Sequence, residues 1–572
     1  MALVQPPLPF LLCANRRIPE KICTVPGSKS CAACKLVSYC SKECQKAHWT
    51  LDQTDCKDHI RSKDWRPVWI RERRPPSFLN HGPPDNLESK FGKHIMAGPQ
   101  ALGIGLSLWG NSPAFDAINL AKNEMDPSRD FAIAFAASGD LRHVVKTVNG
   151  LPEDYSGHLK MVINDNSMPV VCRNVALLII LGTVEDPVYA ADIALHFWYS
   201  THFPTQYHAQ ISASIVAFLT HSHEQEVPFP VGEKAKISVV LEGGPPFSLD
   251  YFSHFTMPSS ASAEEARAEY LRIRTAYSRR DFRDRIYSGL RPSHRAAVQK
   301  YQQLGIILPF GALDDEFDCA NSSLFSLDGR WLQSDFADPL EGWDIAEVVE
   351  AGKKYGACSE DIYGCLYFFL SDQLRTFASR LRRFHITFTL LSLDMTVLAK
   401  GIRENVWSTG VHDLPSSIRF DRILVSNTVD PNYVGIRAVL NAWGPFLACT
   451  QTASIVAYFM NWTLVQQDGR AQAAGSSVVK RITKKLVALN KVSILMNWLK
   501  STHGPLSEGA SSVYWISKGI DLFYDNSEAF STYLKKQGLD RILQELGLVL
   551  KKKNTVVPHV SKIAYPAHLN QF

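Results

Sequence analysis

The sequence predicts an α/β protein whose doubly wound sheet is interrupted by a helical insertion. A strand–helix–strand pattern runs from Phe131 to Asp165, and later apolar segments repeat the order of a strand followed by polar groups. Seven of the 12 cysteines lie within the first 56 residues. We therefore expect a small cysteine-rich unit first, then the sheet, and a helical region after Ala471.

Length and composition describe an ordinary globular protein of more than one domain. A chain of 572 residues exceeds what one hydrophobic core usually supports. No apolar run approaches the ~18 residues needed to span a bilayer. No basic residue precedes the N-terminal apolar stretch, so we expect no secretory signal, no membrane partner and an intracellular protein, cytoplasmic or nuclear.

Positive charge is concentrated at the N-terminal end. The chain has a net charge of +5, whereas residues 1–75 alone carry 14 Lys/Arg and 7 Asp/Glu. Such a surface could contact nucleic acid or acidic peptides. A solvated surface followed by a basic linker explains the charge equally well, so a nucleic-acid partner is not expected.

The N-terminal cysteines are spaced as metal ligands. Cys31-Ala-Ala-Cys34 brings two thiolates together in one tight turn, where both can bind the same ion. Four further residues are separated by multiples of four, which places them on one face of a short helix: Cys40, Cys44, Asp52 and Cys56. In a chain with no expected signal peptide this clustering indicates metal. Because the segment has little apolar mass, the metal must supply much of its folding free energy.

This segment, from about Cys13 to Cys56, resembles the MYND zinc finger, most closely in YCSKECQKAHW and the following Cys56. Members of that family have two interleaved zinc sites and bind proline-containing peptides. The resemblance therefore implies two zinc ions and a protein partner. It assigns one zinc to Cys13, Cys23, Cys40 and Cys44. It assigns the other zinc to Cys31, Cys34, Cys56 and a fourth ligand.

Two positions depart from the family's pattern. Nine residues separate Cys13 from Cys23, where the family usually has a close pair. Asp52 stands where the family has a histidine, eight residues after Cys44. Carboxylate is a legitimate zinc ligand, so we predict Asp52 as the fourth ligand of the second zinc. His48 is the rival on the same helix face, and we expect it to cover the edge of the first site.

The stretch from Trp65 to Pro84 is rich in Arg and Pro and reads as an extended linker or as a wrap on the next domain. Trp65 and Trp69 favour the wrap, because large aromatic side chains are usually buried.

The first part of the predicted sheet is a β-α-β unit. Phe131 to Ala137 is short and apolar, typical of a buried strand, and Ser138-Gly139-Asp140 then turns the chain. An apolar face at helical spacing follows, and Leu159 to Ile163 is a second buried strand that ends in Asn164-Asp165. Parallel strands of this kind place a ligand crevice beyond their carboxyl ends.

Ser138, Gly139 and Asp165 should meet in that crevice, with Asp165 placed for a ribose. The alternative is purely structural: Gly139 makes the turn, and Asp165 caps the next helix, as Ser167 could also do. A single glycine also falls short of the G-x-G-x-x-G fingerprint of dinucleotide sites.

The rest of the body follows the same pattern after a long interruption. Ser167 to Leu181 and Ala190 to Tyr199 read as helices, and residues 200–380 show no clear parallel strand. Within them, Ser262 to Glu265 is a capping box and Ile362 to Leu370 a buried helix. Strands are expected again at three places, with Asn427 at the end of the second: Phe384 to Leu391, Phe420 to Asn427, and Ala453 to Phe459. Five such strands favour a doubly wound, Rossmann-like sheet.

In outline the body is similar to class I S-adenosylmethionine-dependent methyltransferases. That resemblance implies an S-adenosylmethionine site at Ser138, Gly139, Asp165 and Asn427, with Ser392 and Asp394 beside the adenine. Three phrases look more like a fungal family that often carries a MYND finger and is related to an axonemal dynein assembly factor: LWGNSPAFDAINL, FAASGDLRHVVKTVNGLPEDYSG and FDRILVSN. This second resemblance implies assembly and not catalysis.

The predicted organisation has six parts: a finger (1–60), a linker (61–99), a first half of the Rossmann-like body (100–200), a mainly helical insertion (201–380), a second half (381–465) and a helical C-terminal region (466–572). We find no nucleophile–base constellation, P-loop or H-E-x-x-H motif, so no catalytic residue is proposed. A zinc-binding interaction or scaffold protein is the favoured function. A methyltransferase is the alternative, because methyl transfer depends mainly on orienting two substrates.

Overall fold

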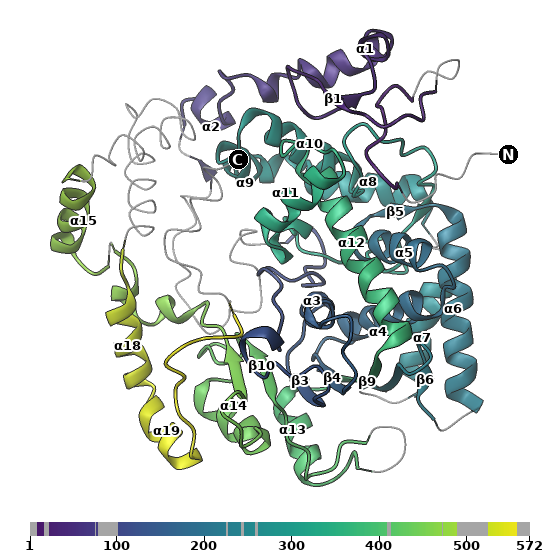
Figure 1. The fold of residues 1–572 in the computed structure, drawn as a ribbon. Coiled ribbons are helices and arrows are strands. Elements are labelled where there is room, and N and C mark those ends of the chain that lie inside the picture. Colours follow the sequence, from purple (N-terminus) through teal and green to yellow (C-terminus); the bar gives the residue numbers. More distant parts are fainter. Residues whose placement is uncertain are drawn as a thin grey trace.

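A seven-stranded, mostly parallel sheet lies at the centre of the body, with helices around it (Figure 1). The computed structural model describes residues 8–16, 22–74, 76–77, 101–224, 227–241, 245–257, 261–408, 413–471, 473–488 and 524–557. The predicted α/β class is confirmed as a mixed α/β fold.

The strands of the sheet follow the order β11-β10-β3-β4-β9-β7-β6. Their bounds are β3 Phe131–Phe135, β4 His158–Asn164, β6 Phe229–Pro230, β7 Lys236–Leu241, β9 His385–Ser392, β10 Arg422–Ser426 and β11 Ser454–Ala457. All pairs are parallel except β6 with β7. The strands of this sheet that follow β3 in the chain, from β4 to β9, all lie on one side of β3. The chain then crosses to the other side, where it adds β10 and β11. The order therefore reverses at β3, which is where open α/β sheets form their ligand crevice.

All five predicted strands are present, but the expectation that residues 201–380 add none is wrong. β7 lies in that segment and pairs in parallel with β9, Ile237 opposite Phe388. Its sequence KISVVL is rich in β-branched residues, the signal that could have revealed it. The strand is short, begins with a charged residue and is only half buried, so its apolar run is weak.

The helices next to the sheet carry the apolar faces that the sequence predicts. Val144, Val145 and Val148 of α3 are buried against the sheet. The flanking helices in the first half and the insertion are α3 Arg142–Gly150, α4 Met168–Thr183, α5 Pro187–Tyr199, α6 Thr205–Glu224, α7 Pro245–Thr256, α8 Ala263–Arg274, α9 Arg280–Ser288, α10 Pro292–Leu304, α11 Ile345–Lys354 and α12 Ile362–Arg383. Ser262 and Glu265 form the predicted capping box at the start of α8.

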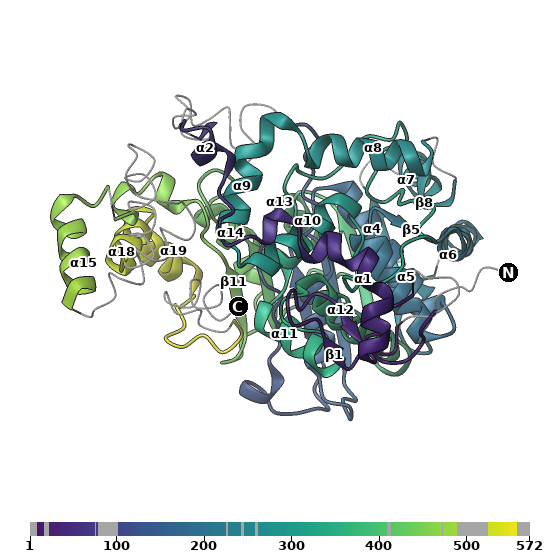
Figure 2. The ribbon, with the colours of Figure 1, turned by 90° about the horizontal axis from the view of Figure 1, so that it is seen from above.

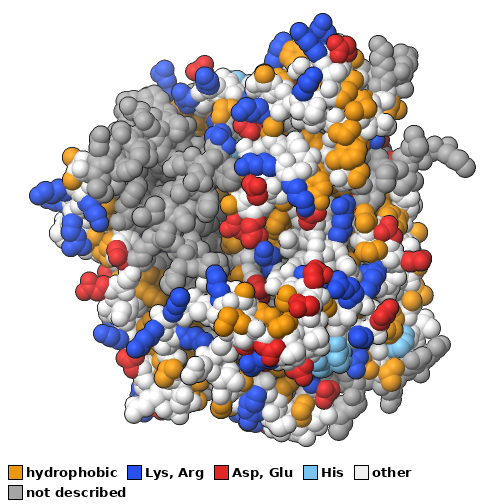
Figure 3. All heavy atoms as spheres, in the orientation of Figure 1, with side chains coloured by type: hydrophobic (Ala, Val, Ile, Leu, Met, Phe, Trp, Pro, Cys, Tyr) orange, Lys and Arg blue, Asp and Glu red, His pale blue; other side chains and the backbone are white. Residues whose placement is uncertain are grey.

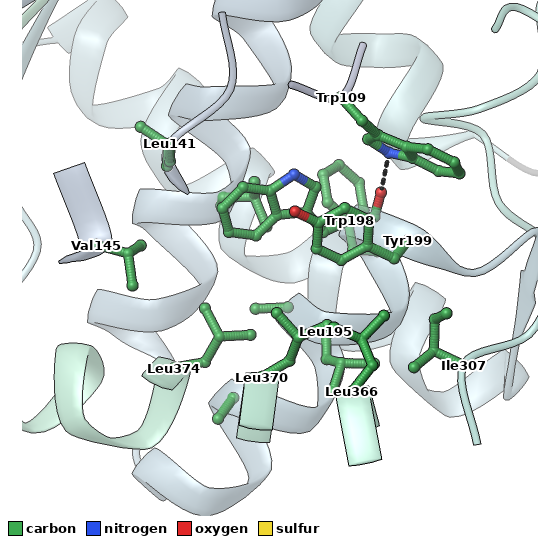
Figure 4. Close-up of a cluster of buried hydrophobic side chains, with 14 of the residues drawn as sticks. Trp109, Leu141, Val145, Leu195, Trp198, Tyr199, Ile307, Leu366, Leu370 and Leu374 are labelled. Atoms are coloured by element: carbon green, nitrogen blue, oxygen red, sulfur yellow. Dashed lines mark hydrogen bonds between the residues drawn. The ribbon is translucent and has the colours of Figure 1, made fainter. Parts of the chain in front are cut away.

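The main core lies between α5, α12 and α3 (Figure 4). Trp198 and Tyr199 stack with ring centroids 5.0 Å apart, and the Trp109 indole N–H donates to the Trp198 carbonyl over 2.7 Å. Leu366 and Leu370 of α12 pack below these rings in the same view. Large aromatic side chains with a satisfied polar atom are well suited to such a core.

Beyond β9 the described helices are α13 Met395–Arg403, α14 Ile436–Trp443, α15 Ser476–Ala488, α18 Ser527–Lys536 and α19 Leu539–Leu546. Helices α18 and α19 pack with α14 in a second cluster of buried residues. The described part of the C-terminal region is thus largely helical, and residues 489–523 and 558–572 of that prediction lie outside the described residues.

The small N-terminal unit comprises β1 Lys29–Ser30, β2 Ser38–Tyr39 and α1 Lys42–Cys56, joined to α2 Val68–Arg71. It lies over α10 and α11 (Figures 1 and 2). Trp65 and Trp69 are buried, and the Val68 amide donates to Asp284 of α9 over 2.6 Å. The stretch from 65 to 74 therefore wraps on the body, whereas residues 75 and 78–99 of the predicted linker lie outside the described residues.

Candidate metal centre and crevice

The first cysteine cluster is formed by Cys13, Cys23, Cys40 and Cys44, whose sulfur atoms all lie within 4.8 Å of one another. The Cys13 amide donates to Val25 and the Cys23 amide to Asn15, so two chain segments are held side by side. Ser41 caps α1 and presents Cys44 in its first turn, 3.4 Å from the sulfur of Cys40. A tetrahedral ion with metal–sulfur bonds of about 2.3 Å separates its sulfurs by about 3.8 Å, close to this spacing.

The second cluster is formed by Cys31, Cys34, Asp52 and Cys56, all buried, with ligand atoms also within 4.8 Å of one another. The Leu36 amide points at the sulfur of Cys34, 3.5 Å away, and Lys35 adopts a positive φ of 57° in the same tight turn. Asp52 and Cys56 are one turn apart on α1. The helix thus gives Cys44 to one cluster and its late ligands to the other. The expectation that Cys40 lies on the same helix face is wrong, because α1 begins at Lys42.

The electrostatics of the second cluster favour a bound cation. Burial raises the pKa of the Cys34 thiol, and the neighbouring Cys31, Cys56 and Asp52 raise it further. Burial likewise raises the pKa of the Asp52 carboxyl. One Asp52 oxygen, Oδ2, is buried without a hydrogen-bond partner in the described chain. Buried groups that are costly to ionise individually become favourable ligands when one zinc ion compensates their charge. The two clusters therefore fit two zinc ions.

Asp52, and not His48, is brought into the second cluster. The His48 ring instead lies beside Tyr39, with its Nδ1 3.1 Å from the hydroxyl. His48 also belongs to neither group of potential ligands in the described residues.

We expect Asp52→Ala to lose one zinc ion per chain and His48→Ala to keep two, because only the aspartate offers a ligand atom to the cluster. Elemental analysis of the two purified variants checks this expectation. Loss of a zinc from His48→Ala alone would show that the assignment is wrong.

The finger, defined here as residues 8–62, shares one continuous hydrophobic core with the body. The Leu11 amide donates to the Tyr355 carbonyl, and the Leu8 amide to the Tyr367 hydroxyl, each over 3.1 Å. Arg295 of α10 donates to the carbonyls of Ile60 and Ser62 and lies 4.8 Å from the Trp65 ring centre. The finger is therefore docked on the body through apolar contacts and hydrogen bonds.

The second candidate site is a crevice at the carboxyl ends of β3, β4, β9 and β10. It has a volume of about 890 Å³, and all four predicted cofactor-binding residues line it: Ser138, Gly139, Asp165 and Asn427. Asp394 also lines it, whereas Ser392 is buried in β9 and is not among its lining residues. The topology thus brings together side chains from three separate parts of the sequence.

Asp165 makes contacts of the kind expected for the structural alternative. Its two carboxylate oxygens accept from the Gly139 amide over 2.9 Å and from the Ser167 amide over 3.0 Å. Gly139 has a positive φ of 58°, which favours glycine at the turn. Burial raises the pKa of Asp165. The expectation that Asp165 or Ser167 caps α4 through its side chain is wrong, because the N-cap is Ser167 and its side chain makes no capping hydrogen bond. Asp394, in contrast, caps α13 through the Thr396 and Val397 amides.

Sequence reasoning missed the side chains that hold the crevice together. Asn164 donates to the carbonyls of Ala136 and Leu393, which ties the ends of three strands. Arg142 forms a buried ion pair with Asp140 over 2.6 Å. A Cβ on Gly110 would come within 1.7 Å of the Arg142 guanidinium, so any larger residue there would displace Arg142 from its position. The G-D-x-R order was visible in the sequence, but its partners near residue 110 were not.

Comparison with known proteins supports the resemblance of the N-terminal segment to a MYND finger. Residues 21–56 match the MYND finger. Residues 108–203 match a domain of unknown function, DUF4470, which here contains β3, α3, β4, α4 and α5. The chain is also similar to dynein axonemal assembly factor 3 of Danio rerio, with 32% identity over 87 residues.

That similarity covers 15% of this chain and 18% of the relative, so the chain spans less than a fifth of the relative's length. No solved structure matches the chain. Among the described residues no helix is long and apolar enough to cross a membrane.

Proposed function

We propose that this chain is a zinc-binding interaction or scaffold protein, in which a two-zinc MYND finger binds protein partners from a non-catalytic, Rossmann-like body. The observation that carries the proposal is the pair of four-ligand clusters within the segment that matches the MYND finger. In this proposal residues 1–60 form the finger, and residues 100–200 and 381–465 form the two halves of the body. The site of action is intracellular, cytoplasmic or nuclear.

Proline-containing peptide segments are the partner class that we propose for the finger. Support comes from apolar side chains that the finger leaves exposed while its other face is docked on the body. Ile22, Val25 and Leu51 are about half exposed. Exposed apolar side chains of this kind can bury a proline ring or an aliphatic side chain of a partner. Figure 3 shows basic side chains at this end of the molecule.

The experiment measures zinc content and peptide binding on the full chain. We expect two zinc ions per chain and binding of immobilised proline-containing peptides. Val25→Asp should keep both ions, because Val25 holds the Cys13 amide through its main-chain carbonyl, but weaken peptide binding at least tenfold. Leu327→Asp, an equally exposed apolar position on the body, is the matched control. One zinc or none, or peptide binding that Val25→Asp leaves unchanged, would contradict the proposal.

A methyltransferase that uses S-adenosylmethionine is the second candidate, favoured by the meeting of Ser138, Gly139, Asp165 and Asn427 in one crevice. An adenosyl group needs the Asp165 carboxylate to accept ribose hydroxyls in addition to the two amides that it already binds. The scaffold proposal needs only those two amide contacts.

We expect no saturable binding of S-adenosylmethionine to the wild type at millimolar concentration, measured by calorimetry. Asp165→Ala should then only lower stability, by about 1–3 kcal/mol, because it removes two amide–carboxylate hydrogen bonds. Asp394→Ala, which also removes two amide–carboxylate contacts at the same crevice, should behave alike. A micromolar binding signal that Asp165→Ala abolishes and Asp394→Ala retains would establish the methyltransferase instead.

A further inference from the structure

The two cysteine clusters differ in how far solvent reaches their thiols. In the first cluster Cys23, Cys40 and Cys44 are partly exposed, and only Cys13 is buried. In the second cluster all four ligand residues are buried. Thiolate character and access to solvent together decide which cysteines react with an oxidant. Bound zinc keeps the cysteines of both clusters as thiolates, so access is what separates the two sites.

Cys40 is placed to form a disulfide within the first cluster. Its sulfur lies 3.5 Å from the sulfur of Cys23 and 3.4 Å from that of Cys44. An oxidised sulfur at this position therefore has a second, partly exposed thiolate in contact with it on two sides. The second cluster offers less, because its fourth ligand is a carboxylate, which cannot form a disulfide.

We propose that Cys40 is an oxidation site, at which a peroxide links Cys40 to Cys23 or to Cys44 and the first zinc is released. One thiolate attacks the peroxide, which gives a sulfenic acid and a hydroxide ion. The neighbouring thiolate then attacks that sulfur and displaces a second hydroxide, forming the disulfide. Two electrons pass from the two sulfurs to the peroxide, and the hydroxides take up two protons to become water. This inference rests on the proposed function, because it requires that both clusters bind zinc.

Oxidation at the first cluster should switch off the proposed peptide surface and leave the docking of the finger intact. Ile22 and Val25 of that surface lie next to Cys23 in the chain. The contact of Ile60 with Arg295 of the body instead follows Cys56, a ligand of the second cluster. The zinc of the second cluster should therefore hold the finger on the body after the first zinc has left.

The test treats the full, zinc-loaded chain with hydrogen peroxide and follows released zinc with a chromophoric chelator. We expect one zinc ion per chain to leave at least tenfold faster than the other, and peptide binding to fall at the same rate. A dithiol reductant with added zinc should restore both. Mass spectrometry of the alkylated wild type should find a disulfide that contains Cys40, together with reduced Cys31, Cys34 and Cys56.

Cys40→His supplies the variant, because imidazole is a zinc ligand but cannot form a disulfide. It should bind two zinc ions and release the first at least fivefold more slowly under peroxide. Cys449→Ser is the control: Cys449 is exposed but belongs to neither cluster, so its loss should leave the release unchanged.

Three results would overturn the inference: equal release of both ions, a disulfide in the wild type that omits Cys40, or peptide binding that survives loss of the first zinc. The disulfide and the release rates are measured on the wild type, so the test stands however Cys40→His folds. A wild type that binds fewer than two zinc ions, or no peptide, before peroxide is added would instead contradict the proposed function.

Discussion

Cys34→Ser should reduce the zinc content from two ions per chain to one and strongly destabilise the finger. Cys34 is buried, and three further ligand groups surround it. Structural zinc contributes about 10–16 kcal/mol of binding free energy in small fingers, and that energy is largely folding free energy. A hydroxyl is a poor zinc ligand, so most of this contribution at the second site is lost. Because the finger shares its core with the body, the body should lose stability as well.

Elemental analysis and thermal unfolding of the full chain measure both effects. Hydrogen exchange adds the spatial information: amides of α10 and α11, under the finger, should exchange faster in Cys34→Ser. Cys172→Ser is the control, since it makes the same substitution at a buried thiol of α4 that belongs to no ligand cluster. It should keep both ions. Normal exchange of α10 and α11 in Cys34→Ser would contradict the view that the finger stabilises the body.

Glu124→Gln should lower the free energy of unfolding by about 3–5 kcal/mol, a large part of the stability of an ordinary domain. Glu124 accepts both its hydrogen bonds from Arg422 of β10, over 2.8 and 3.0 Å. The two side chains are 2% and 0% exposed. Removing the negative charge leaves the buried guanidinium at the start of β10 without the carboxylate that it pairs with. The loss should also disturb Asn427, because it follows β10 at the crevice.

Urea unfolding of the full chain gives the size of this effect. Glu545→Gln is the matched control, because Glu545 pairs with Arg437 over 2.7 Å at the surface, where the side chains are 41% and 49% exposed. Exposed pairs contribute about 0–1 kcal/mol. Equal losses in the two variants would show that burial of the Arg422 pair does not matter.

The β-α-β unit could be predicted from sequence because its signals are local. A short apolar run, a Ser-Gly turn and valines at helical spacing each depend only on neighbouring residues. The crevice residues followed from a topological rule about strand ends. β7 was missed because a half-buried strand among helices has a weak apolar run. Whether the sheet is Rossmann-like in the full sense stays a prediction.

The metal centre was predictable for a different reason. Cysteine spacing indicated a metal site, and the resemblance to the MYND finger then assigned the ligands of the clusters of Cys13 and of Cys31 before any fold was known. The docking of the finger could not, since Arg295 and Tyr367 lie hundreds of residues away from their partners. The contact of Tyr39 with His48 was equally hidden, because nine residues separate them across a turn and a helix.

The docking of the finger also has a consequence for the order in which the chain is made. The finger leaves the ribosome before the body, yet the partners of Ile60 and Leu8 come 235 and 359 residues later in the chain. Synthesis proceeds at about 5–20 residues per second, so the inner face of the finger stays uncovered for roughly 20 to 70 s until the last of these partners has been made. During that time zinc is the main force that can keep this small segment folded, because the residues of the body that complete the shared hydrophobic core have not yet been synthesised. Zinc supply at the moment of synthesis, and not only in the finished protein, therefore governs how much of the chain reaches the docked state.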